Sequence, residues 1–211
     1  MRKSDFPIDS TDSVRALRGA LRTETRTLHD RLDQTFEGIE KLPSRADYVD
    51  FLRLNQACYS QIDPILAAST LQKAAPDLIT PARAQALGDD LSQLDEPAFE
   101  AAPFELATPD LPQALGIAYV AEGSRLGARY IRVSMEKHAA LQRHPDIPTR
   151  FLDEAASRDG RWDMVAALLQ DNDFTSADEQ RCIAAARQTF AYFLMTLDAL
   201  RSRHHYPSEA S

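Results

Sequence analysis

The sequence predicts an all-α protein, a single-domain helical bundle of six to eight helices. Apolar residues recur at helical spacing between breaks that contain proline or glycine, and no alternating β-branched run competes with them. A chain of 211 residues with 44% hydrophobic residues can fill one large core. We see no repeat period and no linker, and we expect a flexible tail at residues 1–10, one domain at 11–205 and a second tail at 206–211.

The first two helices are predicted from capping residues and apolar stripes. Thr11 or Asp12 is a suitable N-cap for a long first helix. Its stripe consists of Val14, Leu17, Leu21, Leu28, Leu32 and Phe36. A capping box that begins at Ser44 then opens a second helix, which runs to about Ala68 and includes the apolar position Tyr59.

The later helices are separated by clear breaks. Thr80, followed by Pro81 at the first helical position, predicts a shorter helix through Leu94. Four prolines make residues 95–112 irregular. Further helices are expected at about 111–141, at 150–157, around 162–169 after a turn at 159–160, and from a capping box at 176–179 to about 205.

One face of the helix at 111–141 is nearly free of side chains. Read at 100° per residue, a single line carries Gly116, Gly123, Gly127 and Ser134, with Tyr119 and Tyr130 beside it. Each glycine inside a helix costs roughly 1 kcal/mol relative to alanine, so this face must allow a close approach. The approaching group is either another helix, which is the commoner reason for such spacing, or a flat ligand.

Composition and short motifs exclude several classes of function. A net charge of -8 argues against nucleic acid and anionic membranes as partners. Cys58 and Cys182 are too few for a disulfide framework, and no C-x-x-C-H motif for covalent haem attachment occurs. No apolar signal or membrane-spanning run is present, so we expect a cytoplasmic protein without a membrane partner.

The histidines do not form a multi-ligand metal site. None has a glutamate three residues before it, as a di-iron bundle requires, and no H-E-x-x-H motif occurs. The chain also lacks a G-x-S-x-G nucleophile elbow. We interpret His138, His144, His204 and His205 as structural or solvated residues.

His29 and the glycine face together suggest haem. Haem iron needs one axial imidazole, a flat apolar slot and cations for two propionates. His29 lies on the flank of the first helix, Asp33 one turn later can accept its other ring N–H, and Arg22 two turns earlier can meet a propionate. Each residue also has a simpler interpretation: His29 as a half-buried histidine, Asp33 and Arg22 as solvated charges, and Tyr119 as a core aromatic.

Two segments resemble the haem oxygenase family. Residues 21–33 (LRTETRTLHDRLD) are similar to its proximal helix, and residues 119–127 (YVAEGSRLG) to the distal helix of its bacterial branch. Residues 158–162 and 189–190 resemble later segments more faintly. The likeness is closest to the biliverdin-producing enzymes associated with bacteriophytochromes, and it implies a haem-oxygenase-like helical bundle.

The resemblance implies a role for each matched residue. His29 becomes the proximal ligand of the haem iron, Gly123, Gly127 and Ser124 the catalytic distal residues, Arg22 and Tyr119 contacts on the propionate side, and Phe190 a pocket wall. Asp33 completes the haem-binding set. Ser124 departs from the aspartate of the better-known branch, Ala128 replaces a further glycine, and Arg125 within the motif points away from the pocket by helical angle.

The resemblance also implies a reaction. Haem b is cleaved to biliverdin, carbon monoxide and ferrous iron, with dioxygen as oxidant and electrons from a ferredoxin, a flavodoxin or a reductase. A bacteriophytochrome is a possible recipient of the product. Two alternatives stay open: a non-catalytic haem carrier or sensor, suggested by Ser124, and a helical hydrolase of thiaminase type that binds no haem.

Overall fold

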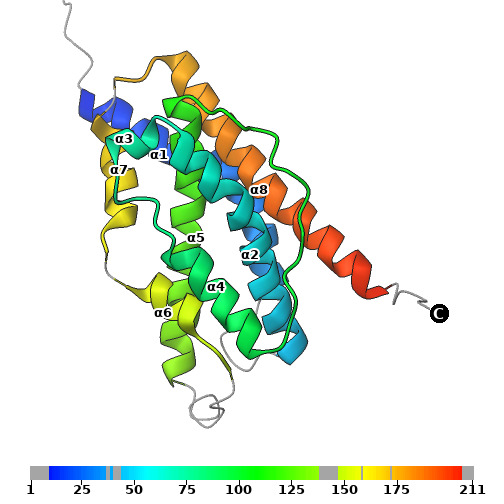
Figure 1. Cartoon of the computed structure of the whole chain (residues 1–211). Helices are drawn as coiled ribbons and strands as arrows, with labels where there is room; N and C mark the ends of the chain where they lie inside the picture. The colour runs from blue at the N-terminus through cyan, green and yellow to red at the C-terminus, as the bar shows by residue number, and fades with distance from the viewer. Residues whose placement is uncertain are drawn as a thin grey trace, which may run out of the picture.

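The computed structural model describes residues 10–36, 39, 44–137, 147–157, 159–171 and 173–205. These residues form eight helices and no strand (Figure 1), which confirms the all-α prediction. The helices are α1 (Ser10–Thr35), α2 (Arg45–Ala68), α3 (Leu71–Ala74), α4 (Ala82–Gln93), α5 (Leu111–Lys137), α6 (Arg150–Ala156), α7 (Arg161–Asp171) and α8 (Ser176–His205). Among the described residues, none of these helices combines the length and the apolar character that crossing a membrane requires.

Some predictions concern residues that lie outside this description. They are the tails at 1–9 and 206–211, the predicted end of the glycine-faced helix at 138–141, and His138 and His144. At the other end, α1 begins at Ser10, one residue inside the predicted N-terminal tail.

Helix starts are set by local hydrogen bonds, and two of them differ from prediction. The capping box of α2 forms as expected, because the Asp47 backbone N–H donates to the Ser44 hydroxyl at 3.1 Å. For α8 the box lies one residue earlier than predicted, between Thr175 and Asp178. The prediction of Thr80 as the cap of α4 was wrong: the helix begins at Ala82, without a side-chain cap.

Two further features were missed. Asp110 and Gln113 exchange backbone-to-side-chain hydrogen bonds of 3.0 Å each, which fixes the start of α5. The four-residue helix α3 is a single turn, too short to show a periodic pattern, although its Leu71 is fully buried.

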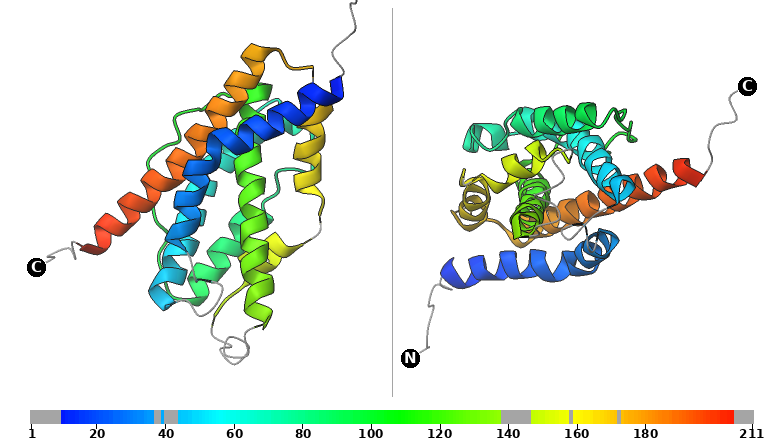
Figure 2. Two further views of the ribbon diagram at one scale, coloured as in Figure 1. Left: turned by 180° about the vertical axis from the view of Figure 1, so that it is seen from behind. Right: turned by 90° about the horizontal axis from the view of Figure 1, so that it is seen from below.

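Helix α5 runs through the middle of the bundle (Figure 1). Its Cα atoms come within 8 Å of those of α8, α6, α7, α2 and α3, whereas in the described part of the chain those of α1 approach only α8 and α7 among the helices. Seen from below, α1 lies on one side of the molecule and α4 on the other (Figure 2). Within the described residues, no Cα atom of α1 comes within 8 Å of one in α5.

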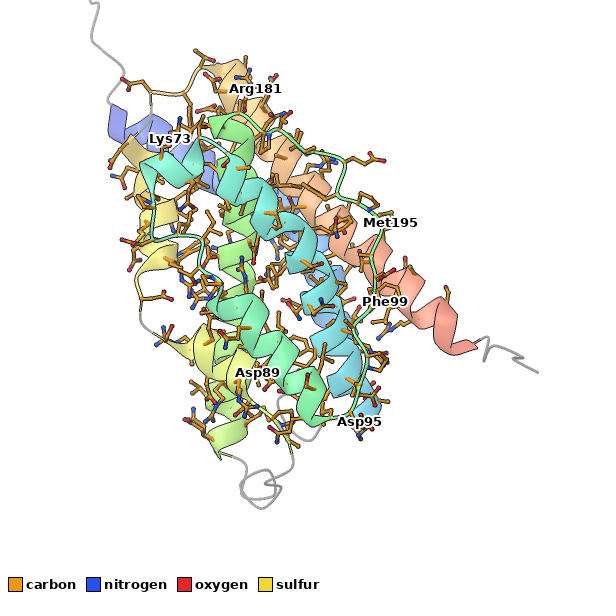
Figure 3. The ribbon with its side chains drawn as sticks, viewed as in Figure 1. Lys73, Asp89, Asp95, Phe99, Arg181 and Met195 are labelled. Atoms are coloured by element: carbon orange, nitrogen blue, oxygen red, sulfur yellow. The ribbon has the colours of Figure 1, made fainter. Side chains whose placement is uncertain are left out.

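The proline-rich segment between α4 and α5 is an ordered strap. It runs from Asp95 past Phe99 alongside α8 (Figure 3). The Phe104 ring packs edge-on against Tyr192 of α8 at 5.1 Å, and the Tyr192 hydroxyl donates to the Ala102 carbonyl at 2.6 Å. The strap therefore covers the apolar side of α8 opposite to α1.

Candidate active site

The side chain of His29 projects from the flank of α1 beside a large cavity. It is 53% exposed, and its Nδ1 lies 3.1 Å from Oδ2 of Asp33, one turn further along the helix. The hydrogen bond to Asp33 raises the pKa of His29 above its ordinary value, against the opposing effect of partial burial. Because Nδ1 faces a carboxylate, Nε2 is the nitrogen that can bind a metal.

Phe190 of α8 supports the imidazole from the side. The two rings meet edge-on with their centroids 5.7 Å apart, and Phe190 is buried. Both residues line the same cavity. The predicted wall residue and the predicted ligand are therefore brought together across two helices that are far apart in the sequence.

A Cβ atom added to each glycine of α5 shows how closely other groups approach that position. At Gly116 the added Cβ would lie 2.1 Å from the carbonyl oxygen of Cys182, so α8 crosses directly over this residue. At Gly123 it would lie 3.5 Å from the Trp162 ring, an ordinary contact. At Gly127 no described atom lies within 4 Å. Helix packing explains the first glycine, and an open space faces the last.

That open space is a cavity of about 950 Å³, at the upper end of the range for small-molecule sites. Its lining is more apolar than polar and comes from α1, α2, α5, α7 and α8. The predicted site residues in the lining are Arg22, His29, Asp33, Tyr119, Gly123, Ser124, Gly127 and Phe190. The cavity therefore lies between α1 and α5, the two helices whose backbones do not meet.

Positive charge lies near Tyr119 at the cavity. Arg22 lines the cavity from α1 and is exposed, and Arg18 lies one turn earlier on the same helix. Tyr119 is half-buried and packs against Trp162, with 5.6 Å between ring centroids. Burial raises the pKa of Tyr119, and the positive charges of Arg18 and Arg22 oppose that rise. Arginines and a phenol thus stand together where a carboxylate could bind.

Ser124 faces the cavity, but its hydroxyl is directed toward α2. It donates to the Ala121 carbonyl oxygen at 2.9 Å and forms a short hydrogen bond with the Tyr59 hydroxyl. Tyr59 was interpreted from the sequence only as an apolar core position. Its role as the partner of Ser124 depends on the packing of α2 against α5, which no local pattern reveals.

Arg125 points away from the cavity, as its helical angle predicts. It is buried and donates to Asp159 at 2.9 Å and to Glu122 at 3.1 Å. Glu122 is also buried, so the face of α5 opposite the cavity carries a charge network inside the protein. Sequence analysis did not anticipate this network, because its partners lie on α4, α6 and the segment before α7.

Trp162 lines the cavity, and sequence analysis did not assign it to the site. It is the single tryptophan of the chain, it contacts Tyr119, and its ring lies 3.5 Å from a Cβ atom added at Gly123. Tyr130 also lines the cavity and is 65% exposed, at the rim. In the described part of the chain, no group of three or more His, Cys, Asp or Glu residues could hold a metal ion.

An imidazole and bare helix backbone facing one slot are the arrangement expected of a helical protein that binds haem. A family model described as heme oxygenase matches residues 15–199, and the chain belongs to this family. The curated protein heme oxygenase PigA from Pseudomonas aeruginosa is 28% identical over 171 residues, which cover 80% of this chain and 85% of PigA.

A solved structure shows the same architecture. The chain matches the NO- and CO-bound heme oxygenase from Neisseria meningitidis with a TM-score of 0.63 and 27% sequence identity. The match covers 92% of this chain and 94% of that one. The prediction of a haem-oxygenase-like helical bundle is confirmed by this comparison.

Proposed function

We propose that this haem oxygenase binds haem b in the cavity between α1 and α5, with His29 as the iron ligand, and degrades it to biliverdin, carbon monoxide and ferrous iron. One observation supports this proposal above all: His29 and Gly127 line one cavity from opposite helices, and Gly127 faces open space. Bound haem supplies the iron at which dioxygen is activated. The residues of the chain hold the ring and control its surroundings.

His29 and Asp33 form the proximal side of the proposed site. Donation from Nδ1–H to the Asp33 carboxylate would fix the tautomer and the ring orientation of a neutral His29, which would leave Nε2 to hold the haem iron. The edge contact with Phe190 limits rotation of the ring further. A histidine ligand also lacks the strong electron donation by which a thiolate favours O–O cleavage.

Arg22 and Tyr119 form the propionate side. Guanidinium groups bind carboxylates through paired hydrogen bonds, and the phenol adds one more donor. Both residues line the cavity from opposite helices, so they can orient the haem within its plane.

Gly123, Gly127 and Ser124 form the distal side. Without side chains at the two glycines, the backbone of α5 can lie directly against the haem plane. Ser124 adds a hydroxyl to this side of the cavity, and that hydroxyl is hydrogen-bonded to Tyr59 of α2.

The reaction requires electrons from outside the chain. We infer a ferredoxin, a flavodoxin or a reductase as donor, in the cytoplasm where reduced donors are generated. A bacteriophytochrome is the proposed recipient of biliverdin. These assignments follow from the resemblance of residues 21–33 and 119–127 to the bacterial enzymes.

The competing function is a haem carrier or sensor, suggested by Ser124 at the position of the aspartate of the better-known branch. To separate the two functions, purified protein is titrated with hemin, and a reductant is then added in air. We expect a Soret band that is lost as biliverdin forms; a band that persists under reductant supports the carrier.

The ligand assignment is tested with His29→Ala, and Thr27→Ala serves as a control because Thr27 is exposed on α1 outside the cavity lining. The first variant should lose the Soret band of the wild type, and the control should keep it. A Soret band and turnover equal to wild type in His29→Ala exclude His29 as the ligand.

A further inference from the structure

Ser124 is attached to the protein core through Tyr59. The Tyr59 hydroxyl contacts the Ser124 hydroxyl and lies 3.3 Å from the carbonyl oxygen of Ala121, so it bridges α2 to α5 one turn before Gly127. Tyr59 itself is 1% exposed and does not line the cavity. Tyr59 reaches the cavity through two lining residues, Ser124 at its hydroxyl and Phe193 at its ring, with 5.7 Å between the ring centroids. Tyr59→Phe keeps the ring contact and removes only the hydroxyl contact with Ser124.

Arg83 of α4 holds Tyr59 in place. Its guanidinium carbon lies 3.9 Å from the centre of the Tyr59 ring, within the range of a cation–π contact. The same guanidinium forms a two-pronged ion pair with Asp63, which follows Tyr59 by one turn on α2, and donates to Glu122 of α5 at 3.2 Å. With its side chain 3% exposed, Arg83 connects three helices around one phenol ring.

The charges continue behind α5 in alternating order. Glu122 accepts from Arg125 at 3.1 Å, and Arg125 donates to Asp159 at 2.9 Å. Asp159 and Glu154 then bind Arg161, whose side chain is 6% exposed. An arginine side chain does not lose its proton in a protein, so this series cannot carry a proton past Arg83. Its contribution to the site is therefore positional.

The position of the Tyr59 hydroxyl determines which hydrogen-bonding sites of Ser124 are occupied. A serine hydroxyl has one donor and two acceptor sites. Ser124 donates to the Ala121 carbonyl at 2.9 Å, and the Tyr59 hydroxyl lies 3.3 Å from the same carbonyl, so Tyr59 donates better to Ser124 through their short contact. One acceptor site of Ser124, a residue that lines the cavity, then stays free. Ser124 then accepts a hydrogen bond from water in the cavity and so orients that water relative to the haem plane.

We propose that Arg83 is a positioning residue of the distal site: by clamping Tyr59 it fixes the Ser124 hydroxyl as a hydrogen-bond acceptor toward the haem cavity. This inference rests on the proposed function, since it assigns a role in haem turnover. It adds two residues, Arg83 and Tyr59, that do not contact the cavity. Their effect should appear in the rate of haem cleavage and not in haem affinity.

The test combines Arg83→Lys and Tyr59→Phe, singly and together. Lysine keeps the positive charge but loses the planar stack and the two-pronged pair with Asp63. Each single variant should reduce hemin turnover by about 10-fold or more, within the range of a lost proton-transfer arrangement. The double variant should be no slower than Tyr59→Phe alone, because both changes remove the same interaction.

Hemin affinity is measured separately through quenching of the fluorescence of Trp162, the single tryptophan, which lines the cavity. It should change by less than about 2-fold, since neither residue contacts the ligand. Arg53→Lys is the matched control: Arg53 is 13% exposed and ion-paired with Glu96 at 2.7 Å, away from the cavity. This control should keep wild-type turnover.

A third measurement uses the ligand-free protein and so does not depend on haem chemistry. The hydroxyl proton of Tyr59, buried and hydrogen-bonded, should be visible by NMR in wild type and in Arg53→Lys, and should exchange rapidly in Arg83→Lys. If Arg83→Lys does not fold, Asp63→Asn loosens the same clamp and should give the same spectrum and the same coupling.

Two results overturn the proposal: a protected Tyr59 hydroxyl with normal turnover in Arg83→Lys, or rate losses that multiply in the double variant. Failure of the wild type to bind hemin overturns the proposed function instead, and the NMR measurement still decides whether Arg83 positions Tyr59.

Discussion

Replacing each of two glycines on α5 by alanine should give opposite results. At Gly116 the new methyl group would meet backbone of α8 at 2.1 Å, so the helices must separate. Overpacking of this kind costs about 1–3 kcal/mol, and the better helix propensity of alanine returns about 1 kcal/mol. Because the obstacle is helix backbone and not the end of a flexible side chain, we expect the upper part of this range, about 2–3 kcal/mol. The net loss is then about 1–2 kcal/mol, or a fall in Tm of about 2–8 °C for a domain of this size.

At Gly127 the same change meets open space in the ligand-free protein. Gly127→Ala should therefore gain up to about 1 kcal/mol from helix propensity, with a rise in Tm of about 2–4 °C. The methyl group would then occupy the slot where the haem plane is proposed to lie. A steric cost of about 1–3 kcal/mol corresponds to hemin binding that is about 5- to 150-fold weaker.

The assay measures thermal unfolding of the ligand-free variants by circular dichroism and hemin affinity by fluorescence quenching. Gly19→Ala is the control, because Gly19 is an exposed residue inside α1, has no described atom near its added Cβ and does not line the cavity. It should be stabilised like Gly127→Ala while keeping wild-type affinity. Unchanged hemin affinity in Gly127→Ala would refute the placement of haem against this face.

Three further predictions concern charged groups around the site. Asp33→Asn removes the hydrogen-bonded charge that raises the pKa of His29. The loss of hemin affinity on acidification, followed by Soret titration, should therefore move to lower pH than in wild type, where it begins above 6.5, the ordinary pKa of histidine. An unchanged pH profile would exclude this coupling. Arg22→Gln should weaken binding of hemin but not of hemin dimethyl ester, whose propionates carry no charge, and equal weakening of both would argue for a packing role. Burial raises the pKa of Asp159, but hydrogen bonds and charge from Arg125 and its neighbours outweigh this and hold the pKa well below its usual range. The stabilisation by Asp159 is thus complete above about pH 5 and lost as pH falls through the lowered pKa, so urea unfolding of Asp159→Asn should converge with that of wild type in acid and differ most near neutrality.

The long helices could be predicted because their signals are local. The stripe that contains Leu17 and Leu21 in α1 and the capping box at Ser44 each depend on residues within a few turns. We predicted that α4 begins at Pro81 with Thr80 as its cap, but it begins at Ala82. A cap sequence does not reveal whether its hydroxyl accepts a hydrogen bond from the backbone N–H. The turn α3 exists because Leu71 is buried by other helices.

The site residues also differ in whether they are marked by local sequence or only by contacts between helices. His29 and Gly127 could be proposed from the sequence because helical angle and glycine content mark them within their own helices, and the structure places both in the lining of one cavity. Gly116 carried the same mark but packs against Cys182, a contact that only the crossing of α5 and α8 determines. Tyr59 was missed for the same reason. Which glycine faces a neighbouring helix and which faces empty space is a property of the assembled bundle.

Helices α1 and α5, which flank the cavity, are held unequally, and this affects how a ligand enters and a product leaves. Helix α5 is fixed on its far side by buried ion pairs and by the crossing with α8 at Gly116. The backbone of α1 approaches only those of α7 and α8 among the helices that the structure describes. Separating α5 from its neighbours would break several buried charge contacts at once, but tilting α1 outward would break mostly apolar contacts at its surface. Loading a rigid macrocycle and discharging a longer, flexible tetrapyrrole should therefore proceed by displacement of the histidine-bearing wall, while the opposite wall stays still and preserves the alignment needed for the next turnover.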